Sequence, residues 1–124
     1  MRKEKTTMPE RVLITGSRSW TDRAKIRAEL AALPRDSIIV HGDCKLGADA
    51  IANEIALELG LGVEKHPADW NAHGKGAGFR RNSEMVNTHP DRCIAFRAPG
   101  RSNGTDDCRG KAERAGVPTK VVTP

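Results

Sequence analysis

Short apolar segments alternate along the chain with longer segments of mixed polarity. Three of the apolar segments are rich in β-branched residues and have no polar face: 12–15 (VLIT), 38–40 (IIV) and 93–96 (CIAF). Segments of this kind are typical of strands in a sheet that is covered on both faces. Two weaker segments, 63–66 and 120–123, are predicted as strands nearer the edges of the same sheet.

The segments between these strands have the apolar spacing of helices. The clearest is 48–59, in which the apolar residues fall on one face and Gly60 follows as a C-terminal stop signal. The other predicted helices span 22–33, 79–88 and 105–115. Thr21 or Asp22 is placed to cap the first of them, and Pro34 to end it.

Strands and helices therefore alternate throughout, which predicts the α/β class with right-handed crossovers. We expect a doubly wound, mostly parallel five-stranded sheet with helices on both faces. The 124 residues suffice for one such domain, assigned to 11–124. Residues 1–10 have no apolar periodicity and are predicted to be a disordered tail.

The formal net charge of +5 favours anionic partners such as nucleotides, nucleic acids or acidic proteins. The basic residues are dispersed and aromatic residues are scarce, which disfavours nucleic acid within that group. Three cysteines without a C-x-x-C pair are typical of reduced thiols, so we expect a cytoplasmic protein. No apolar run reaches the length of a membrane span, so no membrane association is expected.

Ligands of parallel sheets bind outside the carboxyl ends of the strands, and polar, glycine-containing loops follow the predicted strands here. The first loop holds Gly16, Ser17 and Arg18, which is suited to a close backbone approach and a bidentate phosphate contact. A simple strand-to-helix turn is the alternative. The fourth loop has the composition of a phosphate cradle, with donors between two glycines. Its candidate residues are Gly100, Ser102, Asn103, Gly104 and Thr105.

The second loop opens onto the best predicted helix. Its candidate residues are Gly42, Asp43, Gly47, Ala48 and Asp49, whose backbone N–H groups at 47–49 are expected to face a phosphate. Asp49 either caps the helix or accepts hydrogen bonds from ribose hydroxyls. Neither a Walker A motif nor a G-x-G-x-x-G fingerprint is present.

The third loop, 67–78, has three glycines in five residues and is predicted to be a flexible lid or a close-approach loop. Trp70 either stacks on a base or covers the core. Arg80 and Arg81 lie at a predicted helix start, where the helix dipole disfavours cations, so they invite an anion unless they form a solvated basic face. The four histidines are scattered without paired ligand spacing, so we expect no metal and no cofactor.

Four stretches carry a resemblance to a known family. VLITGSR (12–18), VHGDCKLGAD (40–49), FRRNSEM (79–85) and PGRSNGT (99–105) resemble the small YspA-type branch of the SLOG superfamily, in order and spacing. The resemblance implies a Rossmann-like fold that binds nucleotides or nucleotide-derived ligands of the ADP-ribose type, as a sensor or a sequestering protein. It also implies a possible homodimer.

The same superfamily contains the Lonely Guy phosphoribohydrolases, which have an R-K-x-E-M run and a P-G-G-x-G-T-x-x-E motif. Arg81 matches the catalytic arginine of that run, whereas Asn82 stands in place of its lysine. The final glutamate position falls on Cys108, with Asp107 one residue before. The resemblance therefore gives Arg81 and Asp107 as the catalytic pair of the alternative function, a nucleoside-monophosphate phosphoribohydrolase. Cleavage of an N-glycosidic bond needs a carboxylate, which a thiol does not replace. A third function, nucleic-acid binding as in the DprA-type members, ranks lowest.

Overall fold

The computed structural model describes residues 8–124 and contains one parallel sheet flanked by helices. The strands are β1 (Arg11–Gly16), β2 (Ile38–His41), β3 (Gly62–Lys65), β4 (Arg92–Phe96) and β5 (Thr119–Val122). The helices are α1 (Arg23–Ala31), α2 (Gly47–Leu59), α3 (Trp70–His73), α4 (Ala77–Asn87) and α5 (Asn103–Arg114), with a 3-10 turn η1 (Gly74–Gly76) before α4. Residues 1–7 of the predicted tail lie outside the described residues.

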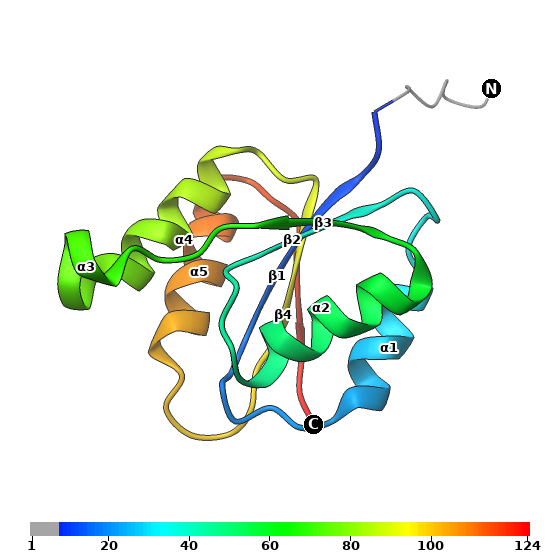
Figure 1. Ribbon diagram of the computed structural model, residues 1–124, viewed down its shortest axis with the longest axis horizontal. Helices are drawn as coiled ribbons and strands as arrows, with labels where there is room; N and C mark the ends of the chain where they lie inside the picture. The colour runs from blue at the N-terminus through cyan, green and yellow to red at the C-terminus, as the bar shows by residue number, and fades with distance from the viewer. Residues whose placement is uncertain (1–7) are drawn as a thin grey trace.

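The strand order is β3-β2-β1-β4-β5, and every neighbouring pair is parallel. From β1 the chain proceeds outward through β2 to β3, and then returns to the other side of β1 to form β4 and β5 (Figure 1). The strand order therefore reverses between β1 and β4. In a sheet of this type, the loops after the two strands at the reversal part from each other and leave a crevice.

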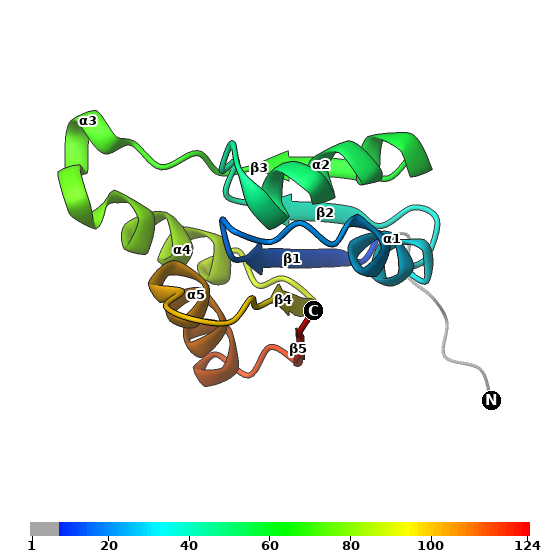
Figure 2. The same ribbon diagram turned by 90° about the horizontal axis from the view of Figure 1, so that it is seen from below.

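Each face of the sheet is covered by its own pair of helices. Val12 and Ile14 of β1 belong to the larger core cluster, with residues of α1 and α2, whereas Leu13 belongs to a second cluster with residues of α4 and α5. Figures 1 and 2 show these two helix pairs on opposite sides of the sheet. The Rossmann-like α/β prediction with helices on both faces is confirmed, and the sheet is parallel throughout.

Local signals in the sequence explain most of the element ends. The carboxylate of Asp22 accepts a hydrogen bond from the backbone N–H of Lys25 at 3.1 Å and so caps α1. Gly60 adopts the left-handed conformation after α2, with a φ of 77°. The helices α4 and α5 each begin two residues earlier than predicted, at Ala77 and Asn103.

The prediction of a flexible lid at 67–78 is wrong. This segment forms α3 and η1, and α3 projects from the body of the molecule beyond the start of α4 (Figures 1 and 2). Asp69 caps α3 by accepting a hydrogen bond from the Ala72 N–H at 3.0 Å. This helix was not predicted because the glycines lower helix propensity. Asp69 is nevertheless a local start signal for a helix, since its side chain caps the first turn.

Candidate functional site

A single large cleft of about 1020 Å³ opens at the carboxyl ends of β1, β2 and β4, at the reversal of strand order. Its walls come from the β1–α1, β2–α2, β3–α3 and β4–α5 connections and from the inner side of α4. The predicted site residues that line it are Gly16, Ser17, Arg18, Gly42, Asp43, Asp49, Trp70, Arg81, Ser102, Asn103, Gly104 and Thr105. Segments up to 89 residues apart in sequence (16 to 105) thus share one cleft.

The prediction that the backbone N–H groups at 47–49 face a phosphate is contradicted at Ala48. Gly47 and Ala48 do not line the cleft, and the Ala48 N–H donates instead to the Ser17 carbonyl at 3.1 Å. Gly47 has a φ of 70°, and a Cβ there would lie 2.3 Å from the same carbonyl oxygen. The β1–α1 loop is therefore packed against the first turn of α2, and the second loop reaches the cleft through residues 42–46.

Three further predicted residues lie away from the cleft. Arg80 lines a separate, shallower hollow beside Phe79 and Lys111. Gly100, with a φ of 89°, forms an exposed turn behind Arg101, which does line the cleft. Asp107 lies outside the cleft wall, and its Oδ2 accepts hydrogen bonds from Asn82 Nδ2 at 3.1 Å and from Lys111 Nζ at 2.9 Å. Arg81 and Asp107 are therefore separated by the Asn82 side chain and do not form a pair.

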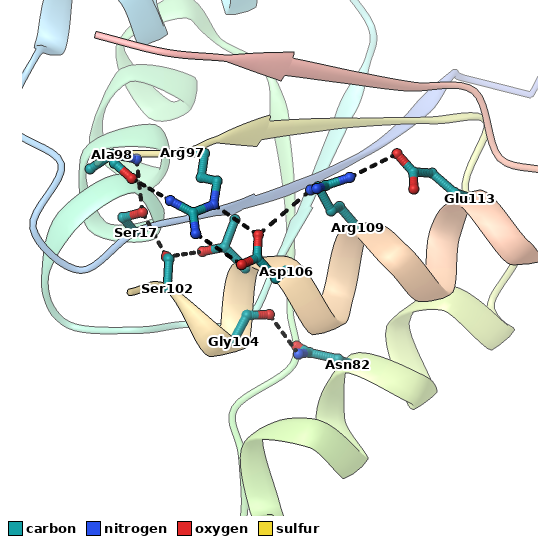
Figure 3. Close-up of polar contacts among 10 residues, drawn as sticks. Ser17, Asn82, Arg97, Ala98, Ser102, Gly104, Asp106, Arg109 and Glu113 are labelled. Carbon is teal, nitrogen blue, oxygen red and sulfur yellow. Dashed lines mark hydrogen bonds and ion pairs between the residues drawn. The ribbon is translucent and has the colours of Figure 1, made fainter. Parts of the chain in front are cut away.

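The N-terminus of α5 borders the cleft and is joined to the β1–α1 loop by a chain of hydroxyl groups (Figure 3). The Ala98 N–H donates to Ser17 Oγ at 3.0 Å, Ser17 and Ser102 Oγ lie 2.7 Å apart, and Ser102 Oγ donates to Thr105 Oγ1 at 3.0 Å. Because the Ser102 hydrogen goes to Thr105, Ser17 must donate to Ser102. Both serine hydrogens are thus used within the protein, whereas the Thr105 hydroxyl hydrogen has no acceptor among residues 8–124.

Ser102 is the N-cap residue of α5, yet its side chain makes no capping bond to the helix backbone. The first N–H groups of a helix have no acceptor within it. Since residues 102–105 line the cleft, the first turn of α5 presents these donors and the positive end of its dipole to it. Arg97, which directly follows β4, stabilises the first turns of α5. Its Nε and Nη2 donate to the two carboxylate oxygens of Asp106 at 2.8 and 2.9 Å. This contact lowers the pKa of Asp106.

Arg81 of α4 fixes the opposite wall of the cleft. Its Nη1 donates to the Gly42 carbonyl at 2.5 Å and lies 3.5 Å from the His66 carbonyl, and its Nε donates to Asn82 Oδ1 at 3.0 Å. Gly42 is required at this contact because a Cβ there would lie 2.3 Å from Nη1. Among residues 8–124, no acceptor lies within hydrogen-bonding distance of Nη2. Arg81 thus holds the loops after β2 and β3 through Nη1, and its Nη2 amine remains available to a ligand.

Asp49 does not cap α2, which corrects one of its two predicted roles. Its Oδ2 accepts hydrogen bonds from the backbone N–H groups of Gly42 at 3.2 Å and Cys44 at 3.4 Å, so it holds the β2–α2 loop against the helix. Burial raises the pKa of Asp49, while the two N–H groups and the Arg81 charge oppose that shift. The other predicted role, at a ribose, stays a prediction.

Buried His41 also binds the β2–α2 loop. The Asp43 N–H donates to its Nδ1 at 2.9 Å, so Nδ1 is unprotonated and Nε2 donates to Asn53 Oδ1 at 3.0 Å. This contact accompanies a left-handed conformation at Asp43, with a φ of 57°. The cleft edge at 42–44 is therefore determined by two buried side chains.

The lining carries more positive than negative charge. The cations are Arg18, Lys45, Arg81 and Arg101, and the carboxyl groups are those of Asp43 and Asp49. Lys45 Nζ lies 3.3 Å from Asp43 Oδ2, so one cation of the lining is paired with one of its carboxylates. Arg18 and Arg101 are exposed and form no ion pair within residues 8–124, so both are available to an anion in the cleft.

Trp70 stands at the outer end of the cleft, half exposed, near Pro67 and Ala68. The alternative that Trp70 covers the core is wrong, because its side chain is 50% exposed, whereas Trp20 is the buried tryptophan, edge-on to Phe96 at 5.4 Å between ring centroids. The outer end therefore offers an aromatic face to a ligand.

Sequence reasoning missed several lining residues, notably Asn82 and Met85. The signal for Asn82 was available: it stands three residues before Met85, so a polar side chain occupies the buried face of α4. The cysteines contribute little chemistry, since burial raises the pKa of Cys93 to about 12 and of Cys108 to about 11. Cys44 lines the cleft without a neighbouring base in a nucleophile's geometry.

In the described part of the chain, no cluster of three or more His, Cys, Asp or Glu side chains is placed to hold a metal ion. No helix within residues 8–124 combines the length and apolar character needed to cross a membrane.

A parallel doubly wound sheet with a polar cleft at its reversal point is the architecture of the Rossmann-like domains. The chain belongs to the YspA, cpYpsA-related SLOG family, whose model matches residues 10–73. Membership of this family suggests a nucleotide-related binding function.

The chain is 46% identical over 117 residues to the gene 61 protein of Mycobacterium phage D29. This match covers 87% of this chain and 92% of the phage protein. Among solved structures, it is similar to the C-terminal domain of a hydrogenase from Pyrococcus furiosus, with 16% sequence identity, a TM-score of 0.48 and coverage of 94% of this chain and 95% of that one.

Proposed function

We propose that the protein binds a nucleotide or a nucleotide-derived ligand of the ADP-ribose type, and acts as a sensor of that ligand or sequesters it. The observation that carries the proposal is the first turn of α5, which lies at the cleft with unused backbone donors. Arg18 and Arg101 line the same cleft, and neither forms an ion pair among residues 8–124. Helix N-termini flanked by arginine are a recurrent site for phosphate groups.

The rest of the cleft matches the remaining parts of such a ligand. Its volume of about 1020 Å³ lies near the upper end of the range for small-molecule sites, roughly 300–1,000 Å³. A phosphate alone would fill a small part of it. Trp70 is suited to stacking on a base, and the carboxylates of Asp43 and Asp49, which also line the cleft, would accept ribose hydroxyls.

The phosphoribohydrolase alternative has less support. Its carboxylate would be Asp107, which lies outside the cleft wall and is bonded to Asn82 and Lys111, and Cys108 beside it is buried. We therefore propose binding without hydrolysis. Incubation with AMP, followed by chromatography for free adenine, distinguishes the two, and release of adenine that is lost in Asp107→Asn would favour the enzyme.

Isothermal titration calorimetry with AMP, ADP and ADP-ribose tests the binding proposal, with adenosine as the control that lacks phosphate. We expect saturable binding of the phosphate-bearing compounds and little heat from adenosine. Removal of both flanking charges in Arg18→Gln/Arg101→Gln should weaken ADP-ribose binding by roughly tenfold to a hundredfold, because each charged hydrogen bond contributes about 1.5–3 kcal/mol in favourable geometry and less at exposed positions. Equal binding of adenosine and AMP would contradict the phosphate site.

A further inference from the structure

Asn82 is a polar side chain in a buried position. It lies on α4 with 4% of its surface exposed, in line with the core residues Met85 and Val86. A buried side-chain amide is costly unless its oxygen and nitrogen are hydrogen-bonded. The partners of Asn82 therefore indicate why an amide is used at this place in the helix.

The oxygen and the nitrogen of this amide bind different walls of the cleft. Oδ1 accepts from Arg81 Nε at 3.0 Å, while Nδ2 donates to the Gly104 carbonyl at 3.2 Å and to Asp107 Oδ2 at 3.1 Å. Gly104 lies in the first turn of α5, and Figure 3 shows its carbonyl directed at the Asn82 amide. One side chain thus connects the arginine of α4 with the helix end at which we place the phosphate.

Arg81 extends this connection to the loops on the far side of the cleft. Its Nη1 binds the Gly42 carbonyl and approaches the His66 carbonyl, so Nε and Nη1 are engaged and Nη2 has no acceptor among residues 8–124. A guanidinium is planar, so fixing Nε and Nη1 also fixes the direction of Nη2. The Asn82 oxygen supplies one of these two fixed points.

We propose that Asn82 is a positioning residue of the binding site: it aims the free Arg81 amine at the ligand and sets its place relative to the first turn of α5. The ligand then meets the arginine and the helix donors as one preorganised unit, which reduces the ordering cost of binding. This role rests on the proposed function. It assigns to Asn82 a contribution to affinity that is made through Arg81.

The first test uses the protein without ligand, so that it holds whether or not the proposed function does. Hydrogen exchange at Arg81 Nε is followed by ¹⁵N NMR, with the resonance assigned by its loss in Arg81→Lys. We expect exchange about tenfold faster or more in Asn82→Leu, which removes the acceptor, than in the wild-type protein. An unchanged exchange rate in a folded Asn82→Leu protein would overturn the proposal. If Asn82→Leu does not fold, Asn82→Ser replaces it in the same measurement.

The second test measures affinity for ADP-ribose by calorimetry. In Asn82→Asp the acceptor for Arg81 remains, but a carboxylate oxygen replaces the donor that faces Gly104 and Asp107. We expect binding to weaken about tenfold, since the Gly104 carbonyl loses its donor and a second carboxylate is placed against Asp107. Asn87→Asp makes the same chemical change at an exposed position of the same helix and should alter the affinity less than twofold.

A double-mutant cycle separates positioning from general destabilisation. Arg81→Lys keeps a positive charge but loses the Nε contact with Asn82. If Asn82 acts through Arg81, Asn82→Leu, which removes the acceptor for Arg81, should weaken ADP-ribose binding at least threefold less in the Arg81→Lys protein than in the wild type. Fully multiplicative losses would overturn the proposal. A wild-type protein that binds no phosphate-bearing compound would instead refute the proposed function, and the exchange measurement would still decide the role of Asn82.

Discussion

Gly42 lies directly beneath the Arg81 guanidinium, and the contact between them leaves no room for a side chain. An added Cβ would lie 2.3 Å from Nη1 and 2.6 Å from Cζ. The glycine is therefore needed for close approach of a side chain to the backbone and not for an unusual φ, since no left-handed conformation is found there. A single absent methyl group thus sets the distance between α4 and the β2–α2 loop.

Substitution Gly42→Ala should displace the guanidinium and weaken ADP-ribose binding about tenfold, with a loss of about 1–3 kcal/mol in the free energy of unfolding from overpacking. Calorimetry and urea denaturation measure the two effects. Gly76→Ala is the matched control: no atom lies within 4 Å of its added Cβ and its φ is −83°, so it should be neutral or slightly stabilising. Equal behaviour of the two variants would contradict the close contact.

Asp49 predicts a dependence of stability on pH. Its pKa is raised in the folded protein, chiefly by burial, so the folded state binds this proton more tightly than the unfolded state does. The contribution of this group to stability is then largest when it is protonated, and declines as the pH rises from the unfolded pKa, about 3.9, through the folded pKa. Asp49→Asn removes the charge and keeps an acceptor for the Gly42 and Cys44 N–H groups.

We therefore expect Asp49→Asn to stabilise the protein at pH 7, with an advantage over the wild type that shrinks as the pH is lowered. Urea denaturation at a series of pH values measures it. A variant that is less stable at neutral pH would mean that the ionised carboxylate, supported by Arg81 and the two N–H groups, outweighs the cost of its burial.

Between elements, the hydroxyl chain from Ser17 to Thr105 joins the β1–α1 loop to α5 across the reversal of strand order. Ser17 also accepts the Ala98 N–H, and its carbonyl accepts the N–H groups of Trp20 and Ala48. The loop after β1 is therefore a junction among α1, α2 and the β4–α5 connection. The hydroxyl of Ser17 therefore serves to hold this junction together more than to bind a phosphate directly.

Ser17→Ala should leave the buried Ala98 N–H without an acceptor and lower the free energy of unfolding by about 1–3 kcal/mol. Ser19→Ala, two residues away and exposed, should change it by less than about 0.5 kcal/mol. Thermal or urea denaturation of the two variants is the measurement. A loss as large in Ser19→Ala as in Ser17→Ala would show that the hydroxyl chain does not carry the stability of the loop.

Over the whole molecule, the doubly wound sheet divides the loops into two ends with different roles. The connections at the carboxyl ends of the strands form the cleft, and those at the amino ends, around 34–37, 60–61 and 116–118, lie at the opposite edge of the sheet. Figure 2 shows the two ends separated by the length of the strands. Ligand contacts should therefore be confined to one end.

Hydrogen exchange measured by mass spectrometry with and without ADP-ribose tests this separation. We expect added protection in peptides that cover 16–19, 42–46 and 101–105, although these peptides are far apart in sequence. Peptides that cover 34–37 and 116–118 serve as internal controls and should not change. Protection at the amino-end loops would place the binding site elsewhere.

The sequence was sufficient to predict the strands, the long helices and the helix stop at Gly60, because these depend on periodicity and on local capping within a few residues. It also predicted that most of the candidate residues share one end of the sheet, since strand-following loops in a parallel sheet gather at one edge. It failed at α3, where three glycines outweighed the Asp69 cap, and at Ala48, whose N–H donates to a carbonyl of another loop.

Periodicity and loop composition thus determined the class of fold and the edge at which a ligand would bind. The tertiary structure determined which polar groups remain free to bind it. Satisfaction of these groups depends on partners that are distant in sequence: the Ala48 N–H donates to the Ser17 carbonyl, and Asp107 accepts from Asn82. The side chain of Ser102 makes no capping bond to the first turn of α5. No pattern along the chain encodes which of these partners will meet, because that is decided by packing of the whole domain.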